Sequence, residues 1–110
     1  MTTTLLFTGR PWTTNVAYNW HPMKRADEVR MVRLYARLFA ISEKVAPHGR
    51  VILTFAQECK TKVMPDTGAC YLWCKAVEDG LVDAGVIPKD TPEFVAEIRF
   101  PAPVSTGRDC

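Results

Sequence analysis

Four aspartates lie between residues 64 and 90, together with Lys75 in an apolar run. Asp66 lies in a Pro-Asp-Thr-Gly turn, Asp79 and Asp83 follow within an apolar run, and Asp90 comes after a proline. Lys75 precedes Asp79 by four residues. Carboxylate oxygens are the ligands that Mg²⁺ prefers, and two or three of them suffice beside retained waters. The pattern is therefore compatible with a metal site formed by Asp66, Asp79 and Asp90.

A plainer interpretation of the same carboxylates stays open. The run from Tyr71 to Ala84 predicts a helix that ends at Gly85. Because Lys75, Asp79 and Asp83 recur every four residues, they share one face of that helix. This face can be a solvated stripe stabilised by a Lys75–Asp79 ion pair, and Asp83 is assigned to it.

Composition predicts one small folded domain over residues 1–110, with a flexible tail from about residue 101. The chain has 110 residues, of which 47% are hydrophobic and 24% charged, and this balance is typical of a globular protein. No apolar run approaches the ~20 residues of a membrane span, so we expect a soluble, cytoplasmic protein without membrane contact. The spacing of the four cysteines does not favour zinc, and we expect them to be reduced thiols.

The elements that must position these residues follow from hydrophobic periodicity and from the Gly and Pro breaks. We expect an ordered loop between the first strand and the first helix. An α+β fold is predicted, with a small mixed β-sheet and two helices packed on one of its faces. The predicted strands are 4–9, 50–59 and 94–100, and the predicted helices are 25–45 and 71–84.

Basic residues concentrate in the first part of the chain, whereas residues 63–98 hold seven acids against two lysines. Arg30, Arg33 and Arg37 recur at helical spacing and share a face. They form either a solvated charged face or a stripe that binds phosphates. In the preceding loop, Trp12 and Trp20 either fill the edge of the core or stack on an exposed base. His21, in the same loop, is a weaker candidate for a general base.

The densest motif is "PDTGACYLWCKAVEDGLVDAGVIPKDTPEFV", and it resembles the RusA family of Holliday junction resolvases. The opening "FTGRPWTTN", which contains Asn15, is similar to the first strand and loop of that family. The likeness covers nearly the whole chain. The matching residues of the motif are Lys75, Asp79, Leu81, Ala84, Gly85 and Asp90.

The resemblance implies a RusA-like fold and a Mg²⁺-dependent endonuclease that acts as a homodimer on branched DNA in phage-type recombination and repair, in the host cytoplasm if the chain is phage-encoded. It implies that Asp66, Asp79 and Asp90 hold the metal and that Lys75 contacts the scissile phosphate; these four are the candidate catalytic residues. The candidate DNA-binding residues are Asn15, Lys24, Arg25, Arg30, Arg33 and Arg37.

Three positions depart from the family pattern. Gly68 and Ala69 stand where the family has Asp and Asn, and Lys89 replaces the first acid of an Asp-Asp pair. A missing carboxylate weakens a metal site, and a lysine beside Asp90 repels a cation. The alternative hypothesis is therefore a catalytically impaired RusA-like protein that binds branched DNA or a host protein without cleaving.

Overall fold

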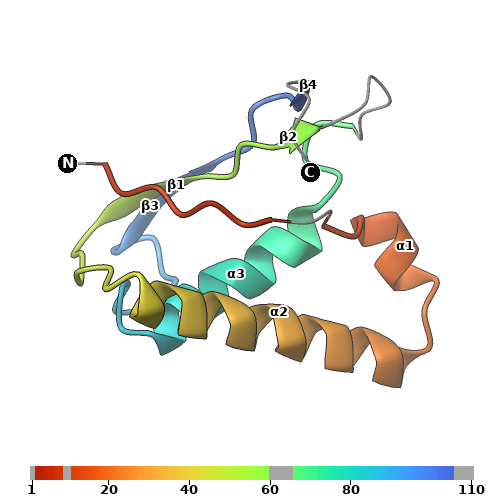
Figure 1. Cartoon of the computed structure of the whole chain (residues 1–110), viewed down its shortest axis with the longest axis horizontal. Coiled ribbons are helices and arrows are strands. Elements are labelled where there is room, and N and C mark those ends of the chain that lie inside the picture. Colours follow the sequence, from red (N-terminus) through yellow and green to blue (C-terminus); the bar gives the residue numbers. More distant parts are fainter. Residues whose placement is uncertain (1, 9–10, 60–65, 106–110) are drawn as a thin grey trace.

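A computed structural model of the chain describes residues 2–8, 11–59 and 66–105. The elements follow the order α1 (Thr14–Tyr18), α2 (Pro22–Ser42), β1 (Val51–Thr54), β2 (Glu58–Cys59), α3 (Tyr71–Asp83), β3 (Val95–Arg99) and β4 (Val104–Ser105). The two long helices lie side by side on the same side of the β1–β3 pair (Figure 1). The predicted α+β class is confirmed.

Helix α2 has well-formed ends. Its N-cap is His21, whose Nδ1 accepts a hydrogen bond from the backbone N–H of Met23 at 3.1 Å, and Pro22 occupies the first turn, where its missing N–H costs nothing. After Ser42 the chain turns through Lys44, whose φ of 54° lies in the left-handed region. The observed helix, Pro22–Ser42, is therefore shifted by three residues toward the N-terminus from the predicted range 25–45.

Helix α3 matches its prediction to within one residue. Its first turn rests on α1, because the Thr14 hydroxyl accepts a hydrogen bond from the N–H of Leu72 at 3.0 Å and so satisfies a donor that has no partner within the helix. At the other end, Gly85 has a φ of +80°, and the N–H of Val86 donates to the carbonyl of Leu81. The Thr14 hydroxyl thus defines the first turn of α3, and the left-handed conformation of Gly85 defines its end.

Helices α2 and α3 approach closely at Gly80. A Cβ on this glycine would clash with the carbonyl oxygen of Arg33 and would lie 2.7 Å from the Cβ of Ala36. Ala36 and Ala40 are the buried residues of α2, so small side chains face each other across this contact. The two helices therefore share a tight interface at Gly80. This close approach fixes the position of Arg33 on α2 relative to Asp83 on α3.

The strands pair in parallel, β1 with β3 and β2 with β4, so the described residues form two small sheets instead of the single mixed sheet expected. An irregularity pairs Val51 with Val95 but Ile52 with Glu97, which leaves Ala96 unopposed. This extra residue breaks the alternation predicted for 94–100, so that Val95 faces the core.

Residues 2–8 form no strand, although a strand was predicted over 4–9; residue 9 lies outside the described residues. Leu5 and Phe7 instead pack against the core without joining a ladder, so core packing and not strand pairing accounts for this apolar run. The core itself joins the two helices, the turn after α3 and β3. Its buried members are Ala36, Ala40, Val77, Leu81, Val86, Ile87 and Val95. In the described part of the chain, every helix is too short or too polar to cross a membrane.

Candidate functional site

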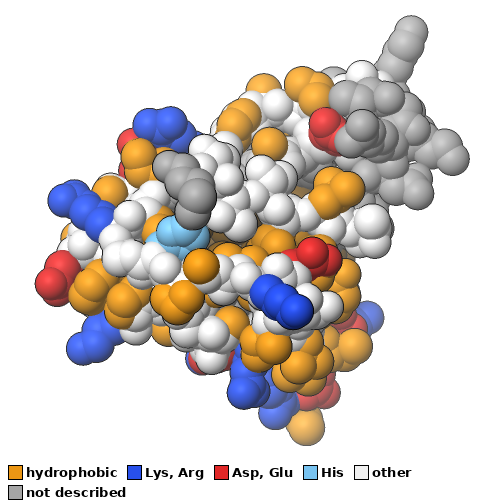
Figure 2. Space-filling model, turned by 60° about the vertical axis from the view of Figure 1, so that its left-hand side comes forward, with side chains coloured by type: hydrophobic (Ala, Val, Ile, Leu, Met, Phe, Trp, Pro, Cys, Tyr) orange, Lys and Arg blue, Asp and Glu red, His pale blue; other side chains and the backbone are white. Residues whose placement is uncertain are grey.

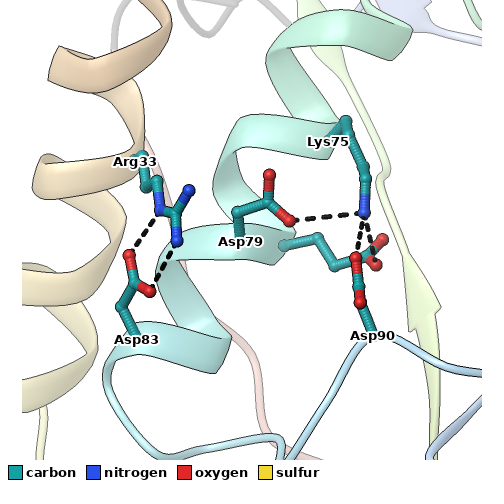
Figure 3. A network of polar contacts seen from close by, with 6 residues as sticks. Arg33, Lys75, Asp79, Asp83 and Asp90 are labelled. Atoms are coloured by element: carbon teal, nitrogen blue, oxygen red, sulfur yellow. Dashed lines mark hydrogen bonds and ion pairs between the residues drawn. The ribbon is translucent and has the colours of Figure 1, made fainter.

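Lys75 stands at the centre of a cluster of three carboxylates. Its Nζ lies 2.5 Å from Oδ2 of Asp90, 3.2 Å from Oε1 of Glu78 and 3.3 Å from Oδ1 of Asp79. Figure 3 shows Asp79 and Asp90 approaching the ammonium from different parts of the chain. The predicted Lys75–Asp79 ion pair is confirmed, and three acids share one cation.

Two elements build this cluster. Helix α3 carries Lys75, Glu78 and Asp79 at spacings of three and four residues, which brings their side chains together on one side. Asp90 reaches them because the chain reverses after α3, where Val86 and Ile87 are buried in the core. The turn is further held by a 2.7 Å hydrogen bond from the N–H of His48 to the carbonyl of Val86. This reversal brings Asp90 back beside α3 and into contact with Lys75.

The carboxylates set the charge state of the cluster. Burial disfavours the charged form of Lys75, but hydrogen bonds to Asp90 and Glu78 outweigh it and raise the pKa of Lys75 above its ordinary value. The hydrogen bond from Lys75 to Asp90 also lowers the pKa of Asp90. At neutral pH the cluster therefore contains the Lys75 ammonium and the ionised carboxylate of Asp90. The Asp79 and Asp90 side chains are 29% and 45% exposed, so solvent and ligands can reach them.

Asp66 lies apart from this cluster along α3. It is exposed and sits in the turn before the helix, where its carbonyl accepts a hydrogen bond from the N–H of Ala69. Asp79 lies nine residues beyond the N-cap Cys70, about 13 Å along the helix axis at 1.5 Å per residue. The structure thus brings together Lys75, Asp79 and Asp90, and places Asp66 near the opposite end of α3.

The donor set fits a divalent cation only in part. Asp79 and Asp90 present carboxylate oxygens to one point, and Mg²⁺ accepts two carboxylates when waters complete its shell. Within residues 2–8, 11–59 and 66–105, however, no three His, Cys, Asp or Glu side chains are arranged as a ready metal site. In this arrangement the Lys75 ammonium supplies the positive charge between the acids.

Asp83 has a more specific role than the solvated position predicted for it. Its two oxygens accept hydrogen bonds from Nε and from one terminal nitrogen of Arg33, at 2.5 and 2.8 Å. This bidentate pair joins α2 to α3, lowers the pKa of Asp83 and raises that of Arg33. Figure 3 shows it beside the Lys75 cluster. Arg33 is therefore engaged by a carboxylate and is the least available of the predicted phosphate ligands.

Aromatic rings and cations meet where α1 leads into α2. The Nζ of Lys24 lies 4.8 Å from the centroid of the Trp20 ring, and the guanidinium of Arg25 lies 5.7 Å from that of Tyr18. Trp12 packs edge-to-face on Trp20 at 5.4 Å, which supports the packing interpretation of these two tryptophans. Residues 1–26 contain no acid at all. This junction, formed by Tyr18, Trp20, Lys24 and Arg25, is called the basic aromatic junction below.

The remaining candidates are at the surface or in structural roles. Arg30 pairs with Asp27 on its own helix, and Arg37 is exposed. Asn15 is exposed on α1, and the side chain of His21 caps the N-terminus of α2.

Cys70 and Cys74 are reduced and buried, and burial raises the pKa of the Cys74 thiol to about 12, which suits an inert core thiol.

Glu78 is the member of the cluster that the helix pattern did not single out. Glu78 directly follows Val77 in an apolar run, and the residue is 2% exposed. The available signal was its spacing of three residues from Lys75, which permits a helical ion pair. Comparisons with family models, with curated proteins and with solved structures found no match to this chain.

Proposed function

We propose that this protein is a divalent-metal-dependent endonuclease that cuts branched DNA, as the resemblance to the RusA family implies. The observation that carries the proposal is the convergence of Asp79 and Asp90 on Lys75. Exposed carboxylates beside a lysine suit phosphodiester hydrolysis, where a bound Mg²⁺ would supply Lewis acidity and activate water. Asp79 and Asp90 would hold the ion, and Lys75 would bind a phosphate oxygen when the acids turn to the ion.

DNA binding has separate support from the charge distribution. The basic aromatic junction offers two cations and two aromatic rings, and the chain carries no acid before Asp27. Arg37 adds an exposed guanidinium on α2. Cations bind the phosphate backbone, and rings stack on bases that have left the duplex. Branched DNA presents both features near its crossover.

A homodimer is supported by a second apolar face on α2. At 100° per residue this face lies opposite Ala36 and Ala40, so it points away from the core. Figure 2 shows apolar side chains standing among Lys and Arg on the molecular surface. A two-fold dimer would set two sites against the two opposed strands of a four-way junction. The exposed apolar residues of this face, called the outer α2 stripe, are Met31, Leu34, Leu38 and Ile41, at 51–64% exposure.

The test is cleavage of an end-labelled four-way junction with and without Mg²⁺. We expect paired nicks that require the metal and are lost in Asp90→Asn, because that change removes one of the two converging carboxylates. Glu93→Gln is the matched control, since Glu93 is exposed three residues further along the chain. Equal cleavage by Asp90→Asn and wild type would refute the assignment.

A second candidate is a protein that binds branched DNA without cutting it. The separation of Asp66 from the cluster favours it, as does the Lys75 ammonium, which already offsets one negative charge of the acids. In that case both the wild type and Asp90→Asn should shift the junction in a gel and neither should nick it. The shift should weaken steeply as salt rises, since phosphate contacts release counterions. A salt-insensitive complex with a host protein would instead indicate a protein target.

A further inference from the structure

Glu78 places a carboxyl group in the protein interior, where a charge is costly. Its side chain is 3% exposed, and its oxygen Oε2 is buried and, among the described residues, has no hydrogen-bond partner. Oε1 has one contact, the ammonium of Lys75 at 3.2 Å. A buried carboxylate with one oxygen unsatisfied destabilises a fold, and an amide or apolar side chain would fill the same space at less cost. Packing alone therefore does not explain why a carboxyl group occupies this position.

The three partners of Lys75 differ in how firmly they are held. Asp79 and Asp90 are 29% and 45% exposed, so both can turn to a ligand, whereas the Glu78 side chain is 3% exposed. Moving Glu78 away from Lys75 would leave its charge buried without any cation. Of the three contacts, the one to Glu78 is therefore the costliest to break.

We propose that Glu78 is a positioning residue that anchors the ammonium of Lys75 from the core side while Asp79 and Asp90 are free to exchange toward a cation. Lys75 then stays at a defined point of the surface with a charge available to a phosphate oxygen. The catalytic part of this inference rests on the proposed nuclease function, but the anchoring of Lys75 does not and can be measured in the absence of DNA.

The experiment compares removal of the buried partner with removal of an exposed one. The ¹⁵N-detected side-chain ammonium signal of Lys75 is recorded in wild type, Glu78→Gln and Asp90→Asn, and Lys75→Arg assigns it by its disappearance. An ordered, hydrogen-bonded ammonium gives a sharp signal, and a mobile one is broadened by exchange with water. We expect the signal to survive in Asp90→Asn and to be lost in Glu78→Gln.

Loss in Asp90→Asn with survival in Glu78→Gln would overturn the proposal, and so would equal behaviour of the two variants. Wild type titrated with Mg²⁺ gives a measurement that needs no variant to fold: the Lys75 signal should persist while the Asp79 and Asp90 carboxyl ¹³C signals move. Its disappearance on adding Mg²⁺ counts against anchoring by Glu78.

If the junction is cut, Glu78→Gln should lower kcat at least tenfold with little change in KM, and Glu78→Asp, which keeps the charge, should recover part of the loss. A Glu78→Gln enzyme with wild-type kcat contradicts the catalytic part of the inference. Absence of cleavage in every protein refutes the proposed function and leaves the ammonium measurement to decide the anchoring.

Discussion

Lys75 binds three carboxylates of unequal exposure, and this inequality determines what each contact contributes. The pairs with Asp79 and Asp90 are open to water, so each contributes little to the free energy of unfolding. The pair with Glu78 is different because one partner is enclosed. Removing the cation would leave a buried carboxylate without a counter-charge, and that is among the larger penalties in protein stability.

Lys75→Met should therefore destabilise the fold by about 2–3 kcal/mol, chiefly through the uncompensated charge of Glu78. Lys89→Met is the matched control, because Lys89 is an exposed lysine next to Asp90, and it should change stability by less than about 0.5 kcal/mol. Urea denaturation followed by circular dichroism measures both. The double variant Lys75→Met with Glu78→Met should regain most of the loss, since it removes the stranded charge. Additive losses would show that the pair is not coupled.

At the scale of elements, the contact between α2 and α3 determines where the polar edges of the two helices meet. Gly80 allows the backbones to approach, and Arg33 and Asp83 then close the contact at the surface. Helix α3 also carries Lys75 and Asp79, so a change in the separation of α2 and α3 also moves the candidate site. Packing and site geometry are linked through α3.

Gly80→Ala tests this link. Alanine normally favours a helix over glycine by about 1 kcal/mol, but here its methyl group would meet the Arg33 carbonyl and Ala36. Overpacking of backbone against backbone should outweigh that gain and give a net loss of about 1–3 kcal/mol. Thermal unfolding is the measurement, and Gly49→Ala is the control, because a Cβ there meets no atom within 4 Å. A more stable Gly80→Ala protein would contradict the tight contact.

The Arg33–Asp83 pair predicts a pH dependence. Its hydrogen bonds lower the pKa of Asp83, so the native state binds the proton less readily than the unfolded chain. The contribution of the pair is fully present above the ordinary aspartate pKa near 4 and is lost as the pH falls through the lower native value. Both side chains are partly exposed, so we expect about 0.5–1 kcal/mol. Asp83→Asn should remove this part of the acid destabilisation, while Asp27→Asn, on the exposed pair within α2, should not.

At the scale of the whole molecule, α2 has apolar side chains on two opposite sides. One side holds the buried alanines that face α3, and the other is the outer α2 stripe. A long helix with an exposed apolar stripe is a common basis for association between copies. Self-association would also bring the basic residues of two chains to one assembly, which would suit the branched DNA proposed as substrate.

Leu38→Glu should convert a dimer to a monomer, because it places a charge in the centre of the outer α2 stripe. Leu38 is 54% exposed, so the change should leave the monomer fold intact. Light scattering after size-exclusion chromatography gives the mass, and Leu6→Glu, at an equally exposed position outside α2, is the control. A monomeric wild type would exclude this dimer.

The sequence alone predicted the α+β class and both long helices, because hydrophobic period and Gly or Pro breaks are local properties of the chain. It also predicted the ion pair of Lys75 with Asp79, since four residues along a helix bring two side chains together. The role of these residues in metal-dependent cleavage stays a prediction.

The tertiary structure decided everything that depends on how distant segments meet. It brought Asp90 to Lys75 through the reversal after α3, placed Asp66 near the other end of that helix, and engaged Asp83 with Arg33. It also buried Glu78, which no period could distinguish from a solvated acid. Each of these outcomes depends on the packing of α2, α3 and the turn that follows, because a side chain's neighbours across a core come from segments far apart in sequence.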